Sequence, residues 1–297
     1  MSDQWSALAE TDFSRARLRE ILYRIGSFLV PGQRSMLSLD EVRAILKPRS
    51  ESYRGVVPVP VDRIVGSEGR YRDFARGFLP RHDYLRPRWV RVDLAHYKDI
   101  PLPPIRLYEL GGAYFVRDGN HRVSVAKLQG AETIDAEVIS LGSELRIEPD
   151  MTLEDLRRTV VAYEKSRFYT ETGFGVITGD FELDFSTPGR YDEILEHILV
   201  HKYYINQGIE EEIGMPEAID SWYLNVYKPI LDTIRAERLA TRFPGRTECD
   251  LYEYMVKHWG GLKKAYGVQL PAAEAARDFS RRYGKGFWER VRALFRT

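Results

Sequence analysis

Five consecutive residues near the middle of the chain are suited to binding a negatively charged group. Asp118, Gly119, Asn120, His121 and Arg122 stand where a β-strand pattern gives way to a helical one. The first backbone N–H groups of a helix have no acceptor within the helix, and they carry the positive end of its dipole. Phosphate is the usual anion at such a position. The sequence therefore predicts a phosphate-binding turn over residues 118–122.

The side chains of this turn have roles that fit phosphate binding. Gly119 lets a ligand approach the backbone closely, and Arg122 offers a planar guanidinium to phosphate oxygens. His121 can donate a hydrogen bond or transfer a proton near neutral pH, while Asp118 can bind a hydroxyl group or a metal-bound water. A purely structural interpretation stays open, in which Asp118 caps the helix and His121 packs in the core.

The segments around this turn predict a small α+β domain over residues 55–142. Its expected elements are an edge strand over 56–61, a hairpin of strands 105–110 and 113–116, a helix over 120–129 and a strand over 133–140. Pro58 and Pro60 place the first strand at an edge, because proline cannot donate a hydrogen bond to a neighbouring strand. In this arrangement the hairpin leads directly into the turn at Asp118.

Helical patterns predominate on both sides of this domain. An amphipathic helix is expected over 13–29 and a short one after Ser38, so residues 1–54 form a helical N-terminal segment. Residues 88–95 are expected to be extended, and a partly helical conformation is the alternative. Residues 152–297 predict a mostly helical domain, in which Pro229 breaks or kinks one helix. The helices expected there span residues 152–168, 190–207, 216–240, 247–266, 271–283 and 286–296.

Charge and cysteine content narrow the functional class. The chain has 297 residues with 44 basic and 44 acidic side chains, a balance that argues against wrapping nucleic acid by bulk charge. Its single cysteine, Cys249, excludes an internal disulfide and a cysteine-cluster metal site. No apolar run approaches the roughly 18 residues that a membrane span needs, and the N-terminus shows no secretory pattern. We therefore expect a cytoplasmic protein without a membrane partner.

The turn and its surroundings resemble the ParB/sulfiredoxin-like fold family. The resemblance is carried by PPIRLYELGGAYFVRDGNHRVSVAKLQGAETIDAEVISL (residues 103–141) and by VVPVPVDRIVGSEGRYRDF (residues 56–74). Together these segments cover less than a third of the chain. The resemblance implies an α+β fold in which a small mixed sheet carries a phosphate- or nucleotide-binding turn. The N-terminal helices and the mostly helical C-terminal domain lie outside it.

Three branches of this family imply different activities. The sulfiredoxin branch uses a cysteine where this chain has Asn120, and Cys249 lies far away in sequence, so thiol chemistry is excluded. The ParB branch binds CTP and carries a helix-turn-helix domain, a pattern that does not follow residue 142; nucleic acid is therefore not a favoured partner. The free-serine kinase branch transfers phosphate from ATP or ADP, and its Asp-Gly-X-His-Arg motif resembles residues 118–122 most closely.

The kinase resemblance implies further site residues. Glu68 would act as the base for the hydroxyl group of a small acceptor, with Asp118 and His121 as the other catalytic residues and Asp118 as a ligand of Mg²⁺. Arg70 and Arg72 are expected to contact the anion, because residues 54–91 hold nine arginines and four acidic residues interleaved with aromatics. A solvated loop carboxylate is the competing interpretation of Glu68.

The sequence therefore leaves two activities open. One is phosphotransfer from a nucleotide to a small hydroxyl compound. The other is a non-enzymatic, nucleotide-gated transcriptional regulator or DNA-associated protein.

The helical half offers weaker candidates. His197 and His201 share a helix face and could bind Zn²⁺, but a packing role is favoured because two ligands alone seldom make a site. The loop over 243–248 leads into a capped helix and is a second, weaker candidate for anion binding. Residues 285–297 are basic and amphipathic, and we expect them to dock on the helical half or on a partner.

Overall fold

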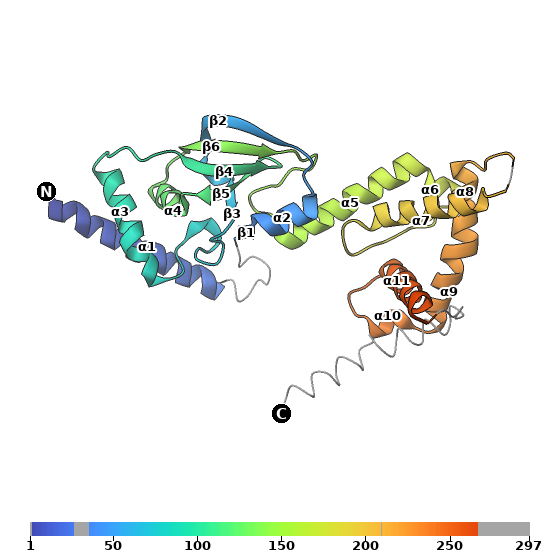
Figure 1. Cartoon of the computed structure of the whole chain (residues 1–297). Coiled ribbons are helices and arrows are strands. Elements are labelled where there is room, and N and C mark those ends of the chain that lie inside the picture. The colour runs from blue at the N-terminus through green and yellow to red at the C-terminus, as the bar shows by residue number, and fades with distance from the viewer. Residues whose placement is uncertain (1, 27–35, 209, 267–297) are drawn as a thin grey trace, which may run out of the picture. The chain divides into compact units, whose positions relative to one another are not determined.

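A six-stranded mixed sheet lies in the first of two units into which the chain divides, residues 1–157 and 158–297 (Figure 1). The computed structural model describes residues 2–26, 36–208 and 210–266. Within these ranges the second unit contains helices and no strand, which confirms the α+β class with a mostly helical C-terminal part. None of the described helices is both long enough and apolar enough to cross a membrane.

The strands lie side by side in the order β1-β3-β5-β4-β6-β2. Their bounds are β1 Leu37–Ser38, β2 Glu51–Pro60, β3 Ile64–Ser67, β4 Ile105–Leu110, β5 Ala113–Asp118 and β6 Thr133–Leu141. β1, β3 and β5 are mutually parallel, while β4 is antiparallel to β5 and parallel to β6, and β2 is antiparallel to β6. Because β3 and β5 run the same way, Ser67 at the end of β3 lies beside Val116, two residues before Asp118.

The structure confirms the hairpin, the closing strand and the edge position of β2. A 3₁₀ turn over Val61–Arg63 joins β2 to β3. β1 and β3 contain two and four residues, which is too short for an alternating pattern to show in the sequence.

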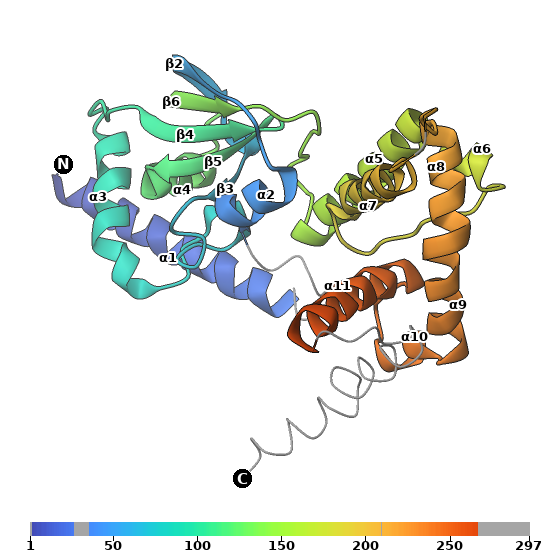
Figure 2. The same cartoon turned by 45° about the vertical axis from the view of Figure 1, so that its right-hand side comes forward.

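Three helices of this unit lie on the same side of the sheet (Figures 1 and 2): α1 Ser2–Gly26, α3 Arg86–Tyr97 and α4 Asn120–Gln129. Phe13, Trp89 and Val123 of these helices share a buried cluster with strand residues. Ser124 fixes α4 in place, because its hydroxyl donates to the Phe78 carbonyl at 2.6 Å and accepts the Trp89 indole N–H at 2.8 Å. The start of α4, which carries the predicted site, is therefore held by buried contacts.

The favoured prediction of an extended segment over 88–95 is wrong and its helical alternative is confirmed, since these residues belong to α3. Trp89 and Asp93, one helical turn apart, are both fully buried. Because Asp93 is polar, the buried face of this helix does not appear in the sequence as an apolar pattern of helical period. The remaining apolar residues alternate by chance, as they would in a strand. The burial of Asp93 is made tolerable by Gln129 of α4, whose side-chain amide donates to the Asp93 carboxylate at 2.8 Å.

The helix expected over 13–29 begins earlier, at Ser2, and is described as far as Gly26. Several of its apolar residues do not face the core, contrary to the amphipathic pattern expected. The residues that it buries include Ala9, Phe13 and Ala16, while Leu18, Leu22 and Ile25 are exposed. Packing on α3 sets the rotation of the helix, because the Phe13 ring lies edge-on to Trp89 with 5.6 Å between centroids. α2, Leu39–Leu46, follows Ser38 as predicted, although the Ser38 side chain makes no capping hydrogen bond.

The helical part follows the predicted pattern closely. Its elements are α5 Leu153–Thr172, α6 Phe174–Ile177, α7 Arg190–Ile205, α8 Met215–Trp222, a π-helical turn Tyr223–Tyr227, α9 Lys228–Ala236, α10 Leu239–Arg242 and α11 Glu248–Tyr266. Pro229 lies in the first turn of α9, directly after the π-helical turn, which confirms that it interrupts the regular helix. The helices expected over 271–283 and 286–296, and the amphipathic segment 285–297, lie outside the described residues.

Candidate phosphate-binding site

The turn between β5 and α4 depends on the conformation of Gly119. Its φ of 109° is in the left-handed region, and a Cβ atom there would lie 2.5 Å from Cγ2 of buried Ile105. The Val123 N–H donates to the Gly119 carbonyl at 3.0 Å. The amides of Asn120, His121 and Arg122 precede it, so they have no acceptor within the helix.

Two side-chain atoms at the start of α4 are buried and have no hydrogen-bond partner among the described residues: Oδ1 of Asn120 and Nε2 of His121. The two residues are only 7% and 5% exposed. Leaving a buried polar atom without a partner costs about 1–3 kcal/mol, so such atoms mark places where a ligand or water completes the network. Two of them on consecutive residues, beside free helix amides, make this the strongest ligand-binding feature of the sheet unit.

The surroundings of His121 keep its ring neutral. Burial and the positive charges of Arg88 and Arg70 lower the pKa of His121 to about 4, against the opposing effect of Asp73. The Phe74 ring stands edge-on to the imidazole with 5.4 Å between centroids. A neutral imidazole in a positive environment can donate one hydrogen bond and accept another, and the same positive charge favours an anionic ligand.

Arg122 is held by the protein itself. Its Nη2 donates to the Asp118 carboxylate at 2.7 Å, and its Nη1 donates to the backbone carbonyls of Pro103 and Pro104, the latter at 3.1 Å. The side chain is 15% exposed. In this arrangement Arg122 supports the segment that leads into β4. A contact between its guanidinium and phosphate stays a prediction that requires Asp118 to give way.

The loop after β3 lies next to the turn, as the parallel pairing of β3 and β5 requires. The buried Ser67 hydroxyl donates to the Val116 carbonyl at 3.2 Å and accepts the Arg70 backbone N–H at 3.3 Å. The Glu68 N–H also donates to the Val116 carbonyl, at 2.9 Å. The structure thus places the predicted residues Glu68 and Arg70 at the same end of the strands as Asp118. Ser67 lies there too, although the sequence does not predict it as a site residue.

The predicted arginines differ in their surroundings. Arg70 pairs with Asp73 at 2.9 Å, and the exposed Arg72 lies over the Tyr71 ring, 5.7 Å from its centroid. Arg88, which the sequence pattern does not identify as a site residue, influences His121 more strongly than Arg70 does. It was missed because residues 88–95 were expected to be extended, whereas the helix places Arg88 in the first turn of α3.

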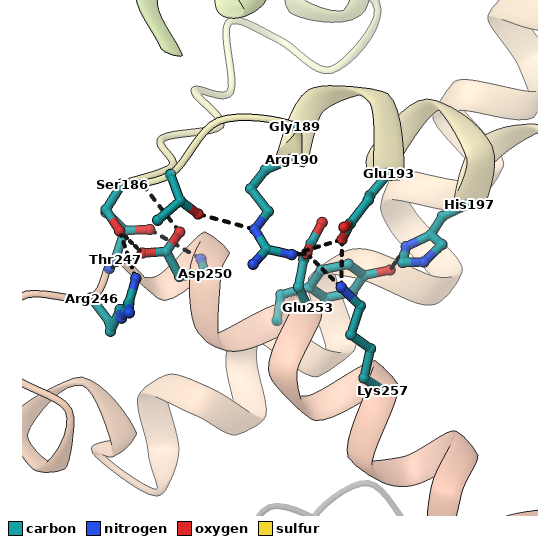
Figure 3. Close-up of polar contacts among 12 residues, drawn as sticks. Ser186, Gly189, Arg190, Glu193, His197, Arg246, Thr247, Asp250, Glu253 and Lys257 are labelled. Atoms are coloured by element: carbon teal, nitrogen blue, oxygen red, sulfur yellow. Dashed lines mark hydrogen bonds and ion pairs between the residues drawn. The ribbon is translucent and has the colours of Figure 1, made fainter. Parts of the chain in front are cut away.

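In the helical unit the predicted zinc and anion candidates contact other residues of the chain. Figure 3 shows His197 and Asp250 among them. His201 Nε2 lies 3.0 Å from the Ser221 hydroxyl, and no group of three or more metal-binding side chains was found among the described residues. At the start of α11, Asp250 accepts the Thr247 N–H at 3.0 Å and the Ser186 hydroxyl at 2.6 Å. The chain's own carboxylate therefore fills this helix N-terminus.

An ionic cluster around the buried Glu253 joins α7 to α11 (Figure 3). Arg190 donates to the carboxylates of Glu193, at 2.9 Å, and Glu253, while Lys257 donates to Glu193 at 2.8 Å. Glu253 is 1% exposed, and burial together with its contact to Glu193 raises its pKa to about 8. Burial acts in the same direction on Glu193, but its hydrogen bonds with Glu253, Lys257 and Arg190 prevail and lower its pKa.

We expect the Glu253→Gln variant to lose a pH dependence of stability that the wild-type chain has. Because the folded-state pKa of Glu253 is raised, the folded state holds this proton more tightly than the unfolded state, and stability falls as the pH rises through about 8. The expected loss between neutral pH and about pH 9 is about 1 kcal/mol, measured by urea unfolding. Glu196→Gln, an exposed change on α7, the helix that packs against Glu253 through Arg190 and Glu193, should keep the wild-type slope. Equal slopes in wild type and Glu253→Gln would contradict the assignment.

Comparison with known proteins gives little guidance beyond the geometry. No known family matches the chain, and no curated protein sequence matches it significantly. Among solved structures it is similar to a Pnob8-like ParB-N domain, with 9% identity and a TM-score of 0.22, covering 83% of this chain and 99% of that one. The fold class therefore rests on the sheet and helices described above.

Proposed function

We propose that the chain binds a nucleotide or another phosphate compound at the start of α4. The observation that carries this proposal is the pair of buried, unpartnered atoms, Asn120 Oδ1 and His121 Nε2, beside the free amides of the first helical turn. Arg70 and Arg88 add positive charge at the same place. The resemblance of residues 103–141 to ParB/sulfiredoxin-like proteins independently favours a phosphate ligand.

The Asn120→Asp variant tests this proposal. A carboxylate at this position is attracted by the helix dipole and the free amides, so we expect α4 to remain folded. The same negative charge competes with a bound phosphate, so affinity for ATP, ADP, CTP and tripolyphosphate should fall at least about tenfold. Isothermal titration calorimetry of the full chain, with and without Mg²⁺, measures these affinities.

A matched control separates this local effect from a change in net charge. Thr133→Asp adds the same charge at the exposed start of β6, beyond the other end of α4, and should change each affinity less than about twofold. If none of the four ligands binds the wild-type chain at about millimolar concentration, the proposal is wrong. It is equally wrong if Asn120→Asp binds them as tightly as the wild type.

Phosphotransfer would extend this function, with Glu68 as the base. The hydrogen bond from the Glu68 N–H to Val116 supports this role, since it holds Glu68 at the sheet edge where the turn begins. Any Mg²⁺ would be held by Asp118 together with the phosphate oxygens of the ligand, because Mg²⁺ commonly takes few protein ligands when substrate phosphates are present. A Glu68→Gln chain should then bind nucleotide normally but form no phosphorylated acceptor from serine or another small alcohol.

A further inference from the structure

An exposed pair of aromatic rings lies on the loop that joins β3 to α3. The rings of His82 and Tyr84 are stacked, with 5.2 Å between centroids and an angle of 12° between planes. Tyr84 is 64% exposed. A tyrosine whose ring is half-covered by another flat ring, and otherwise open to solvent, presents a surface on which a planar ligand can stack.

Hydrogen bonds hold this pair in a defined position. The Tyr84 hydroxyl donates to Asp73 Oδ1 at 2.5 Å, and Arg70 donates to the other oxygen of the same carboxylate at 2.9 Å. The Arg81 N–H donates to the Asp73 carbonyl at 2.9 Å, which ties the backbone before His82 to the same residue. A surface that is already ordered loses little conformational entropy when a ligand binds.

The same contacts connect the aromatic pair to the candidate phosphate site. Arg70, which pairs with Asp73, also donates its backbone N–H to Ser67, and Ser67 is bonded to Val116 just before the turn. Phe74, the residue after Asp73, packs edge-on against His121. The aromatic pair is thus linked by a chain of contacts to the start of α4, at the end of strands β3 and β5.

Two arginines add positive charge to these linked residues. Arg88 follows Tyr84 by four residues, across the start of α3, and it acts on His121 together with Arg70. Both guanidinium groups would therefore add favourable charge for a ligand that places phosphates at the α4 amides and a planar group at Tyr84. A nucleoside di- or triphosphate has this distribution of charge and planar surface, whereas inorganic phosphate and sugar phosphates lack the planar group.

We propose that His82 and Tyr84 form a stacking platform for the base of a nucleoside phosphate, which makes nucleotides the ligand class of this site. This inference rests on the proposed phosphate-binding function. Stacking on an aromatic side chain does not select strongly among bases, because every base has a π face. The platform therefore predicts that nucleotides bind more tightly than base-free phosphates, with little difference between ATP and CTP.

The test compares ATP, CTP and tripolyphosphate by isothermal titration calorimetry on the full chain. In the wild type, both nucleotides should bind at least about tenfold more tightly than tripolyphosphate. Tyr84→Ala should weaken the two nucleotides about tenfold and leave tripolyphosphate within about twofold. Tyr84→Phe keeps the ring and removes only the hydroxyl that bonds Asp73, so it should retain nucleotide affinity within about threefold.

Controls separate stacking from a general loss of structure. Tyr53→Ala removes an equally exposed tyrosine, 65% exposed, from the edge strand β2 and should change none of the three affinities. Tyr84→Trp should show tryptophan quenching, relative to wild type, on adding nucleotide but not on adding tripolyphosphate.

The possible outcomes distinguish this inference from the proposed function. If tripolyphosphate binds as tightly as the nucleotides, or if Tyr84→Ala weakens all three ligands equally or none of them, the stacking platform is refuted while phosphate binding stands. If no ligand binds the wild type, the phosphate site itself is refuted.

Discussion

Replacing Gly119 with alanine is expected to destabilise the sheet unit by about 2–5 kcal/mol. The φ of 109° is unfavourable for a residue with a side chain, and the added methyl group would lie 2.5 Å from Ile105 Cγ2 and 2.9 Å from its Cβ. Ile105 is fully buried at the start of β4 and cannot move aside without disturbing the hairpin. Urea unfolding, combined with hydrogen exchange of peptides within residues 103–141, measures this loss.

Gly130→Ala provides the matched control at the other end of the same helix. Gly130 also has a positive φ, 73°, but a Cβ atom there would meet nothing within 4 Å. Its expected cost is only the conformational one, about 1–2 kcal/mol. The difference between the two variants isolates the contact with Ile105. Equal losses would mean that Gly119 is required for its backbone conformation alone.

The parts of the fold that the sequence predicts correctly are those specified by local signals. The Gly111–Gly112 turn identifies the hairpin, Gly130 ends α4 in the left-handed conformation, and Pro58 and Pro60 place β2 at an edge. Each of these signals acts within a few residues of the feature that it determines. Their predictive value therefore does not depend on how distant segments pack.

The errors arise where distant contacts decide the outcome. α3 was expected to be extended because its helical period includes Asp93, whose burial depends on an amide from α4. The rotation of α1 is set by Trp89, more than seventy residues away in sequence. Such contacts override local pattern, because a buried polar group is tolerated wherever a tertiary partner satisfies it.

The candidate site likewise has one part that the sequence predicts and another part that depends on tertiary contacts. The strand-to-helix turn and its glycine follow from the sequence alone, since they are features of five consecutive residues. The hydrogen bond from Arg122 to the Pro104 carbonyl depends on a neighbouring element. The effect of Arg88 on His121 does so as well. The sequence thus predicts where an anion would bind, whereas the tertiary structure identifies which cations and rings surround it.

The His121→Gln variant is expected to lose an acid sensitivity that the wild-type sheet unit has. The pKa of His121 is lowered from 6.5 to about 4 in the folded state, so below about pH 6.5 the unfolded state binds the proton more readily. Stability should therefore fall as the pH drops from 7 to about 4.5, by about 2 kcal/mol for this group alone. Glutamine keeps a polar side chain without a titrating group. The pH dependence of the variant's unfolding free energy therefore lacks the contribution of His121.

The measurement is the unfolding free energy of the sheet unit in each chain at neutral pH and at about pH 4.5, with the carboxylates contributing equally to both. His82→Gln, a change in an exposed histidine of the same unit, serves as the control and should keep the wild-type slope. Saturating tripolyphosphate should reduce the acid loss of the wild type, because a negative charge beside His121 raises its pKa back toward 6.5. An acid slope that is the same in wild type and His121→Gln would contradict the lowered pKa of His121 and the neutral ring assigned to it.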